Sequence, residues 1–192
     1  MTDTHRRLRY AVAASLDGYI AGPNGEADWI PHDPDIDFGA IWAQFDTLFI
    51  GRKTFVAMTG GKTGDKRGKK RGKKSEGGVF DVKTVVFSRT LDPKDYPSAT
   101  IISDGVEEAV AAMKRQPGKD IWLFGGGELF TSLSALGLVD TVEVALVPVM
   151  LGAGRPLFPG GAARVPLAFT SQRVYGKSGI LALEYSVVRS WV

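Results

Sequence analysis

The chain has 192 residues, of which 44% are hydrophobic and 23% are charged, a composition that suits one globular domain with a sizeable core. It contains no cysteine and only two histidines, His5 and His32, which excludes disulfides and a thiol nucleophile and argues against any metal site. No apolar run approaches the roughly 20 residues that span a bilayer, and the N-terminus lacks the apolar core of a signal peptide. We therefore expect a single cytoplasmic domain over residues 1–192, with no membrane partner.

The net charge of +3 comes from one segment of the chain. Residues 60–78 contain 8 of the 24 Lys and Arg but only 2 of the 21 Asp and Glu, which leaves 16 basic and 19 acidic residues elsewhere. The glycine-rich composition of this segment predicts a flexible insert. We favour a solvated loop over a lid that attracts a phosphorylated ligand. A nucleic-acid-binding arm is the least favoured reading, because the segment has no aromatic residue for base stacking.

The hydrophobic pattern predicts strands and helices that alternate along most of the chain. The first strand covers residues 8–15, and an amphipathic helix covers residues 37–45, with Asp37 at its N-terminus. Another helix starts within residues 51–54, and a third opens with Asp104 and Glu107 as a capping pair. Further strands are predicted at residues 47–50, 83–88, 99–102, 121–124, 141–149, 167–174 and 180–188. A last helix runs from residue 128 to a C-cap at Gly137.

This order of elements predicts the class of fold. Strands that alternate with helices through residue 137 favour a mainly parallel α/β sheet. The last two strands follow one another across a short turn, so they favour an antiparallel edge. The pattern contains no internal repeat and no linker between domains.

A glycine run between the strand at 121–124 and the helix from residue 128 is the strongest functional signal. A strand that ends in glycines and opens a helix offers unpaired N–H groups and a positive dipole to a phosphate group. A tight turn that needs glycine only for its conformation is the alternative. The Rossmann fingerprint fails because Phe130 stands where glycine is required, and a Walker A loop fails at Val56.

Two other strand ends carry basic and hydroxyl side chains. Residues 51–54 provide Arg52, Lys53 and Thr54, and residues 88–90 provide Ser88 and Arg89. Ligands of parallel α/β sheets bind beyond the carboxyl ends of the strands, so three such ends side by side would line one cleft. Cations near a ribose select a 2′-phosphate, which favours NADP over NAD; solvated surface charges are the alternative.

Five segments in this order resemble the reductase domain of the bacterial bifunctional deaminase–reductase of riboflavin synthesis, a member of the dihydrofolate reductase-like superfamily. They are residues 13–21, 50–55, 86–90, 124–129 and 148–158. The resemblance spans residues 8–188 and implies a three-layer α/β/α fold, with a mostly parallel central sheet of about eight strands and an antiparallel C-terminal strand. No zinc deaminase domain precedes it, so we expect a stand-alone member, and the family's reductases imply a homodimer.

The resemblance also implies an activity and a cofactor site. The activity would be that of an NADPH-dependent oxidoreductase, a 5-amino-6-(5-phosphoribosylamino)uracil reductase. Dihydrofolate reductase activity, or NADPH binding without turnover, is the alternative. Residues 125–129 would hold the pyrophosphate, with a cis peptide between Gly125 and Gly126, and Ser88 and Arg89 the 2′-phosphate. The expected cofactor-binding residues are Ala13, Ile20, Gly51, Arg52, Lys53, Thr54, Phe87, Ser88, Arg89, Phe124, Gly125, Gly126, Gly127, Glu128 and Leu129.

The substrate side is expected to carry acids, because the resemblance implies a carboxylate at the start of the helix that precedes the Gly51 strand. Asp37 lies at that start, Asp35 matches better when counted back from Gly51, and Asp17 is the third catalytic candidate; Asp33 is a further polar group. An ordinary helix-terminal acid and a turn former are the alternatives for Asp37 and Asp17. The expected substrate-binding residues are Ser15, Trp29, Leu151 and Gly152, although Trp29 would serve equally as a core residue.

Overall fold

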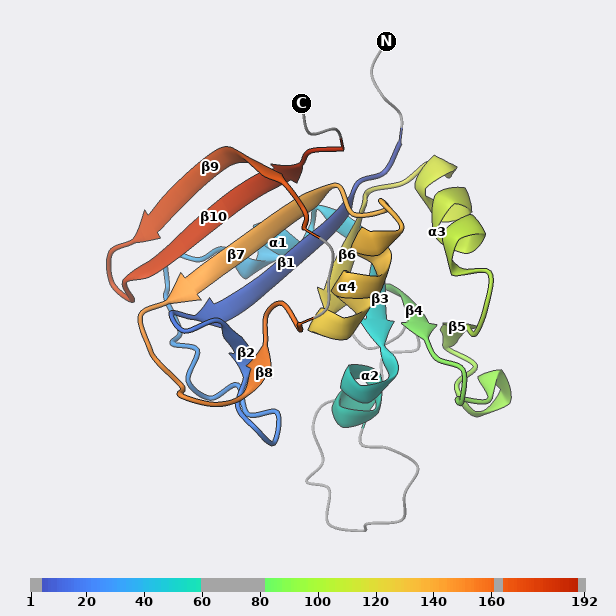
Figure 1. Ribbon diagram of the computed structural model, residues 1–192, viewed down its shortest axis with the longest axis horizontal. Coiled ribbons are helices and arrows are strands. Elements are labelled where there is room, and N and C mark those ends of the chain that lie inside the picture. Colours follow the sequence, from blue (N-terminus) through green and yellow to red (C-terminus); the bar gives the residue numbers. More distant parts are fainter. Residues whose placement is uncertain (1–4, 60–81, 161–163, 190–192) are drawn as a thin grey trace.

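The computed structural model describes residues 5–59, 82–160 and 164–189, so the basic insert predicted at residues 60–78 lies outside the described residues. The described residues form an eight-stranded sheet, a two-stranded sheet and flanking helices (Figure 1). The elements in chain order are β1 (Leu8–Ser15), β2 (Tyr19–Ala21), α1 (Phe38–Trp42), β3 (Phe45–Gly51), α2 (Arg52–Thr59), β4 (Lys83–Phe87), the 3₁₀ helix η1 (Pro93–Asp95), β5 (Ala99–Ile102), α3 (Val106–Arg115), β6 (Asp120–Gly125), α4 (Gly127–Ala135), β7 (Thr141–Val147), β8 (Arg155–Pro156), β9 (Leu167–Tyr175) and β10 (Ile180–Val187).

The strand order of the large sheet is β5-β4-β3-β6-β1-β7-β10-β9, which puts the first strand of the chain well inside the sheet. The strands from β5 to β7 are parallel to their neighbours, whereas β10 is antiparallel to both β7 and β9. The prediction of a mostly parallel sheet with an antiparallel C-terminal edge is therefore confirmed. The short strands β2 and β8, which the sequence pattern did not indicate, pair in the second sheet.

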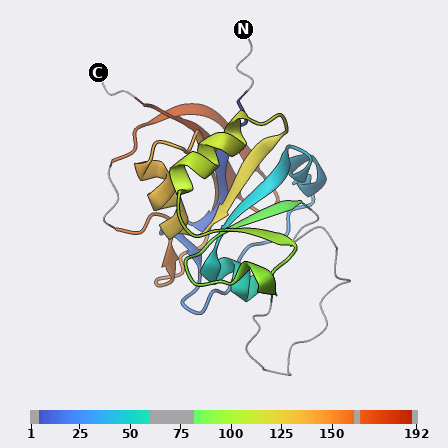
Figure 2. The same ribbon diagram turned by 90° about the vertical axis from the view of Figure 1, so that its right-hand side faces the viewer.

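The helices lie on both faces of the large sheet, as expected for three layers. Helices α3 and α4 cover one face and α1 lies on the other, which two views show together (Figures 1 and 2). Crossovers between parallel strands are right-handed, so the direction of each step through the sheet decides the face of its helix. Within the described residues, none of the helices is long and apolar enough to span a membrane.

The main core lies between the large sheet and helices α3 and α4. Leu8 of β1 and Leu123 of β6 are fully buried there, because strands covered on both faces need nearly continuous apolar residues, and Leu133 of α4 is fully buried against them. Tyr10 of β1 stacks on Phe130 of α4 with 4.4 Å between ring centroids. Burial raises the pKa of the Tyr10 phenol above its ordinary value. This packing fixes α4, and with it the glycine run that precedes the helix.

Two predictions about helix ends need correction. Helix α1 covers Phe38–Trp42 and not residues 37–45, because Phe45 already pairs with Asp120 as the first residue of β3. Asp37 is the N-cap of α1, and its Oδ1 accepts a hydrogen bond from Ala40 N at 2.9 Å. The predicted capping pair of α3 is wrong, since Gly105 is the N-cap and no side chain caps this helix.

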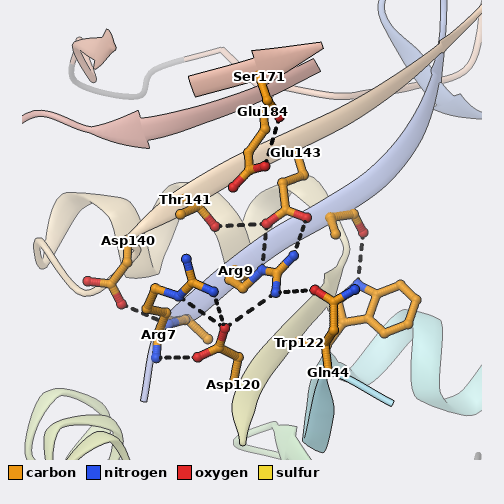
Figure 3. A network of polar contacts seen from close by, with 12 residues as sticks. Arg7, Arg9, Gln44, Asp120, Trp122, Asp140, Thr141, Glu143, Ser171 and Glu184 are labelled. Atoms are coloured by element: carbon orange, nitrogen blue, oxygen red, sulfur yellow. Dashed lines mark hydrogen bonds and ion pairs between the residues drawn. The ribbon is translucent and has the colours of Figure 1, made fainter. Parts of the chain in front are cut away.

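A buried arginine on β1 ties together the amino ends of three neighbouring strands (Figure 3). The Arg9 side chain is 9% exposed, and its Nε and Nη2 donate to the two carboxylate oxygens of Glu143 on β7 at 2.6 and 2.7 Å. Its Nη1 donates to Gln44 Oε1 at 2.8 Å and to Asp120 Oδ2 at 3.3 Å. The guanidinium also lies 4.7 Å from the centre of the Phe45 ring.

Electrostatics explain why this arginine is tolerated in the interior. Burial disfavours the charged guanidinium, but the hydrogen bonds and charges of Glu143 and Asp120 outweigh it and raise the pKa of Arg9. Burial likewise opposes ionisation of Asp120, while the hydrogen bonds and charge of Arg7 lower the pKa of that carboxyl. Arg9 therefore depends on its carboxylate partners for a stable ionised state.

Replacing Glu143 by Gln should destabilise the protein by about 3 kcal/mol, because a nearly buried guanidinium would lose its bidentate counter-charge. Urea unfolding followed by circular dichroism measures the change. Glu184→Gln is a matched control, since Glu184 on β10 accepts its hydrogen bond from the neutral Ser171 Oγ, at 3.0 Å, and not from a guanidinium. The control should lie within about 0.5 kcal/mol of the parent, and equal losses in the two variants would contradict this account of Arg9.

Candidate active site

The three strand ends singled out in the sequence lie next to one another. Strands β4, β3 and β6 are neighbours in the sheet and are parallel, so Ser88, Gly51 and Gly125 stand at the same edge. The arrowheads of β3 and β6 and the start of α2 meet at this edge in Figure 1. We call it the carboxyl edge, which means the end of the sheet where the parallel strands finish and not one of its outermost strands. The prediction that these motifs come together is confirmed by the strand order.

The end of β3 and the peptide that follows β6 lie side by side at the centre of the carboxyl edge. A Cβ on Gly51 would lie 3.6 Å from Gly125 O and 3.8 Å from Gly126 N, so β3 ends against the peptide that follows β6. That Gly125–Gly126 peptide is cis, as the resemblance implied, and Gly125 has φ of 126°. A Cβ on Gly125 would meet nothing within 4 Å. Gly125 is buried and Gly126 is half-buried, and neither places a side chain over the peptide, so this backbone allows the close approach that a pyrophosphate requires.

Gly127 has a different reason to be glycine. It begins α4, and a Cβ there would lie 2.7 Å from Pro159 Cδ and 2.9 Å from Leu157 O. The helix start is thus pressed against the loop that follows β8. Gly126, the N-cap, supplies no side chain, so no side chain caps the first N–H groups of the helix.

The predicted cations surround this backbone cradle. Arg52, Lys53 and Arg89 are exposed, and Lys53 Nζ lies 3.2 and 3.3 Å from the two carboxylate oxygens of Glu128 on α4. Neither Arg52 nor Arg89 has a hydrogen bond or ion pair with another residue of the described ranges. Thr54 is half-buried, with Oγ1 3.8 Å from the place of a Cβ on Gly126. These groups fit a polyanionic ligand at the carboxyl edge.

Ser88 has a structural task that the sequence did not reveal. Its side chain is buried, and Oγ accepts hydrogen bonds from Thr90 N at 3.2 Å and Leu91 N at 3.1 Å. The hydroxyl therefore folds the turn that presents Arg89. Phe87 packs edge-on against Phe49 with 5.1 Å between centroids, Phe124 lies 5.6 Å from Trp122, and Leu129 faces Gly51, so these three apolar residues support the cradle.

Four of the predicted substrate-side residues form one hydrogen-bonded cluster. Ser15 Oγ donates to Asp17 Oδ1 at 2.6 Å and accepts from Tyr19 N at 2.9 Å. Asp17 also accepts from Leu151 N at 3.1 Å and Gly152 N at 2.7 Å. The hydrogen bond from Ser15 and those from the two backbone N–H groups lower the pKa of Asp17. Asp17 is therefore an ionised tie between the β1–β2 turn and the loop after β7.

The three acids before α1 have separate environments. Asp33 is 1% exposed and accepts from Ser178 N and Asp35 N, each at 2.9 Å. The Ser178 side chain further lowers the pKa of Asp33. Asp35 pairs with Lys177 Nζ at 2.8 Å, and Asp37 caps α1. The turn between β9 and β10, which the sequence analysis did not assign to the site, thus holds the loop that carries these acids.

The remaining predicted residues border this region. Ala13 lies half-buried on β1 beside Ala145, and Ile20 on β2 packs against the core. Trp29 is half-buried and donates from Nε1 to Glu26 O at 3.1 Å, so it is not a core residue. Phe38 of α1 is 51% exposed, although Trp42 lies 4.4 Å from Trp122. Helix α1 therefore contacts β6 through Trp42 and leaves Phe38 for other contacts.

The fold is dihydrofolate reductase-like. Dihydrofolate reductase from Enterococcus faecalis, solved with NADP(H) and RAB-propyl, is similar with a TM-score of 0.59 and 20% identity over 94% of each chain. The deaminase/5-amino-6-(5-phosphoribosylamino)uracil reductase of Thermotoga maritima gives a TM-score of 0.68 and 19% identity over 97% of this chain and 58% of its own.

The family model of the RibD C-terminal domain matches residues 6–181, and the chain belongs to this family. The uncharacterised protein YyaP of Bacillus subtilis (strain 168) is 39% identical over 180 residues, which cover 94% of each chain. The resemblance noted in the sequence is thus confirmed at the level of the family, and the family points to oxidoreductase chemistry.

Replacing Gly127 by Ala should destabilise the protein by about 1–3 kcal/mol or prevent folding, because the added methyl group would overlap Leu157 O and Pro159 Cδ. Urea unfolding measures the loss. Gly176→Ala is the control, since its methyl group would meet nothing within 4 Å. A Gly127→Ala variant as stable as the control would show that α4 can move away from the loop.

Proposed function

We propose that the protein is an NADPH-dependent reductase that acts on 5-amino-6-(5-phosphoribosylamino)uracil or a close chemical relative. The observation that carries the proposal is the meeting of Gly51 with the Gly125–Gly126 peptide at adjacent strand ends, with cations around them. The Thermotoga maritima neighbour is a 5-amino-6-(5-phosphoribosylamino)uracil reductase, which supports the substrate, and the NADP(H) complex of the Enterococcus faecalis neighbour supports the cofactor.

The two ends of the cofactor would meet different groups. The backbone of Gly125 and Gly126, the first turn of α4, Thr54 and Lys53 would hold the pyrophosphate. Arg89, presented by the Ser88 turn, would pair with the 2′-phosphate of NADPH, which NADH lacks. Arg52 adds positive charge at the same edge. The bound nicotinamide supplies the hydride that reduces a C=O or C=N carbon.

The other side of the carboxyl edge would orient the substrate. The Ser15–Asp17 cluster fixes the turn after β1. Ala13 and Ile20 would border the nicotinamide. Asp37 and Asp35 are exposed carboxylates that would accept hydrogen bonds from ring N–H groups of a pyrimidine. Leu151, Gly152 and Trp29 would border the same space. Fixed orientation of the two reactants lowers the barrier to hydride transfer.

The cofactor claim predicts tighter binding of NADPH than of NADH, measured by fluorescence titration. Arg89→Ala should weaken NADPH binding about tenfold or more and leave NADH binding nearly unchanged, because the lost charge-assisted hydrogen bonds involve only the 2′-phosphate. Lys94→Ala, which removes an exposed charge from η1, is the control. Equal and weak binding of the two cofactors to the parent protein would overturn the 2′-phosphate assignment.

Steady-state oxidation of NADPH, followed by absorbance, identifies the substrate. We expect turnover with 5-amino-6-(5-phosphoribosylamino)uracil and none with dihydrofolate. Turnover with dihydrofolate alone would favour the second candidate, which the structural similarity to the Enterococcus faecalis enzyme supports. Tight NADPH binding without turnover of either compound would favour a protein that binds the cofactor and does not use it.

A further inference from the structure

An ion pair joins the first turns of two helices at the carboxyl edge. Lys53 is the second residue of α2 and Glu128 is the second residue of α4. Lys53 Nζ lies 3.2 Å from Glu128 Oε1 and 3.3 Å from Oε2, and the two side chains are 65% and 75% exposed. The pair therefore spans the two helix starts at the surface of the molecule.

The backbone beneath this pair is the glycine cradle. Gly51 directly precedes α2, Gly126 directly precedes α4, and a Cβ on Gly51 would touch the Gly125–Gly126 peptide. Two helix N-termini thus start side by side, and each favours negative charge. Any anion held by this backbone lies close to both members of the pair.

Glu128 opposes an anion at these two helix starts. It is the only acidic residue in the first turns of α2 and α4, and its negative charge interacts favourably with the positive end of the dipole of α4. For a bound pyrophosphate the same carboxylate is a repelling neighbour. In the structure Glu128 also forms an ion pair with Lys53, the cation that is expected to bind the phosphates.

We propose that Glu128 is an affinity-setting residue that competes with the cofactor pyrophosphate for Lys53. This inference rests on the proposed NADPH site. Binding requires Lys53 to leave Glu128 for the phosphates, and this exchange is easy because exposed ion pairs contribute little to stability. Glu128 then remains as an uncompensated negative charge beside the ligand. The ion pair therefore lowers the affinity for the cofactor, and a lower affinity favours release of the cofactor after each hydride transfer.

The expected size of the effect follows from Coulomb's law. A single like charge about 6 Å away in a water-like dielectric changes a binding equilibrium by about threefold, and a pyrophosphate carries two such charges. Removing the charge of Glu128 should thus tighten binding by about three- to tenfold. Salt should reduce this gain, because ions screen exposed charges.

Fluorescence titration of the Glu128→Gln variant with NADPH and with NADH tests the proposal. We expect Kd to fall about three- to tenfold for both cofactors by the same factor, since the pyrophosphate is common to them. The preference for NADPH should stay constant, in contrast to Arg89→Ala. The gain should shrink in 0.5 M NaCl. Glu184→Gln, which makes the same change in net charge on β10, should leave both Kd values unchanged.

A double variant separates competition from simple repulsion. In a Lys53→Met background there is no cation to compete for, so Glu128→Gln should improve Kd by a smaller factor than it does in the parent. If Glu128→Gln changed Kd by equal factors in the two backgrounds, competition for Lys53 would be ruled out and charge repulsion would be the whole effect. An unchanged or weaker Kd in the single variant, with the parent binding NADPH well, would overturn the whole inference. Failure of the parent to bind either cofactor would instead overturn the proposed function beneath it.

Discussion

At the carboxyl edge, the end of β3 lies beside the peptide that follows β6, and this closeness governs the rest of the site. Ile50 pairs with Gly125, and a Cβ on Gly51 would lie in ordinary van der Waals contact with Gly125 O at 3.6 Å and Gly126 N at 3.8 Å. The pairing of β3 with β6 brings the starts of α2 and α4 together, so the positive ends of two helices and their first side chains share one small region. The proposed binding of a polyanion and the competition between Lys53 and Glu128 both follow from this proximity.

The amino ends of the parallel strands, at the opposite end of the sheet, hold the strands in position and carry none of the proposed site. The Arg9 network joins β1, β6 and β7 where these strands begin, while the glycine contacts and the Asp17 cluster act where they end. Strand β1 is thus held at both ends by groups that make several hydrogen bonds each. A strand fixed in this way keeps Ala13 and the turn after Ser15 in place, which a reaction between two bound molecules requires.

Sequence patterns predicted the sheet, its antiparallel edge and the glycine cradle, because these depend on local periodicity and on residues adjacent along the chain. They failed at two helix ends. Gly105 and not Asp104 is the N-cap of α3, and Phe45 joins β3 and not α1 because it pairs with the distant Asp120. The pairing of Asp33 with Ser178 lies beyond any local pattern, since 145 residues separate the two. The Asp33-x-Asp35 spacing of an Asx turn was the one available signal.

The link between Asp33 and the β9–β10 turn has a consequence for how the protein is made. The loop that bears the candidate acids emerges early from the ribosome, but its partner Ser178 is synthesised near the end of the described chain. Strand β1 likewise waits for β6 and β7 on either side. Such distant pairings make folding slow and place it late in synthesis. The loop that bears Asp33 is therefore among the last parts to take shape, and a nascent chain that stalls before β10 lacks the hydrogen bond from Ser178 N that holds it.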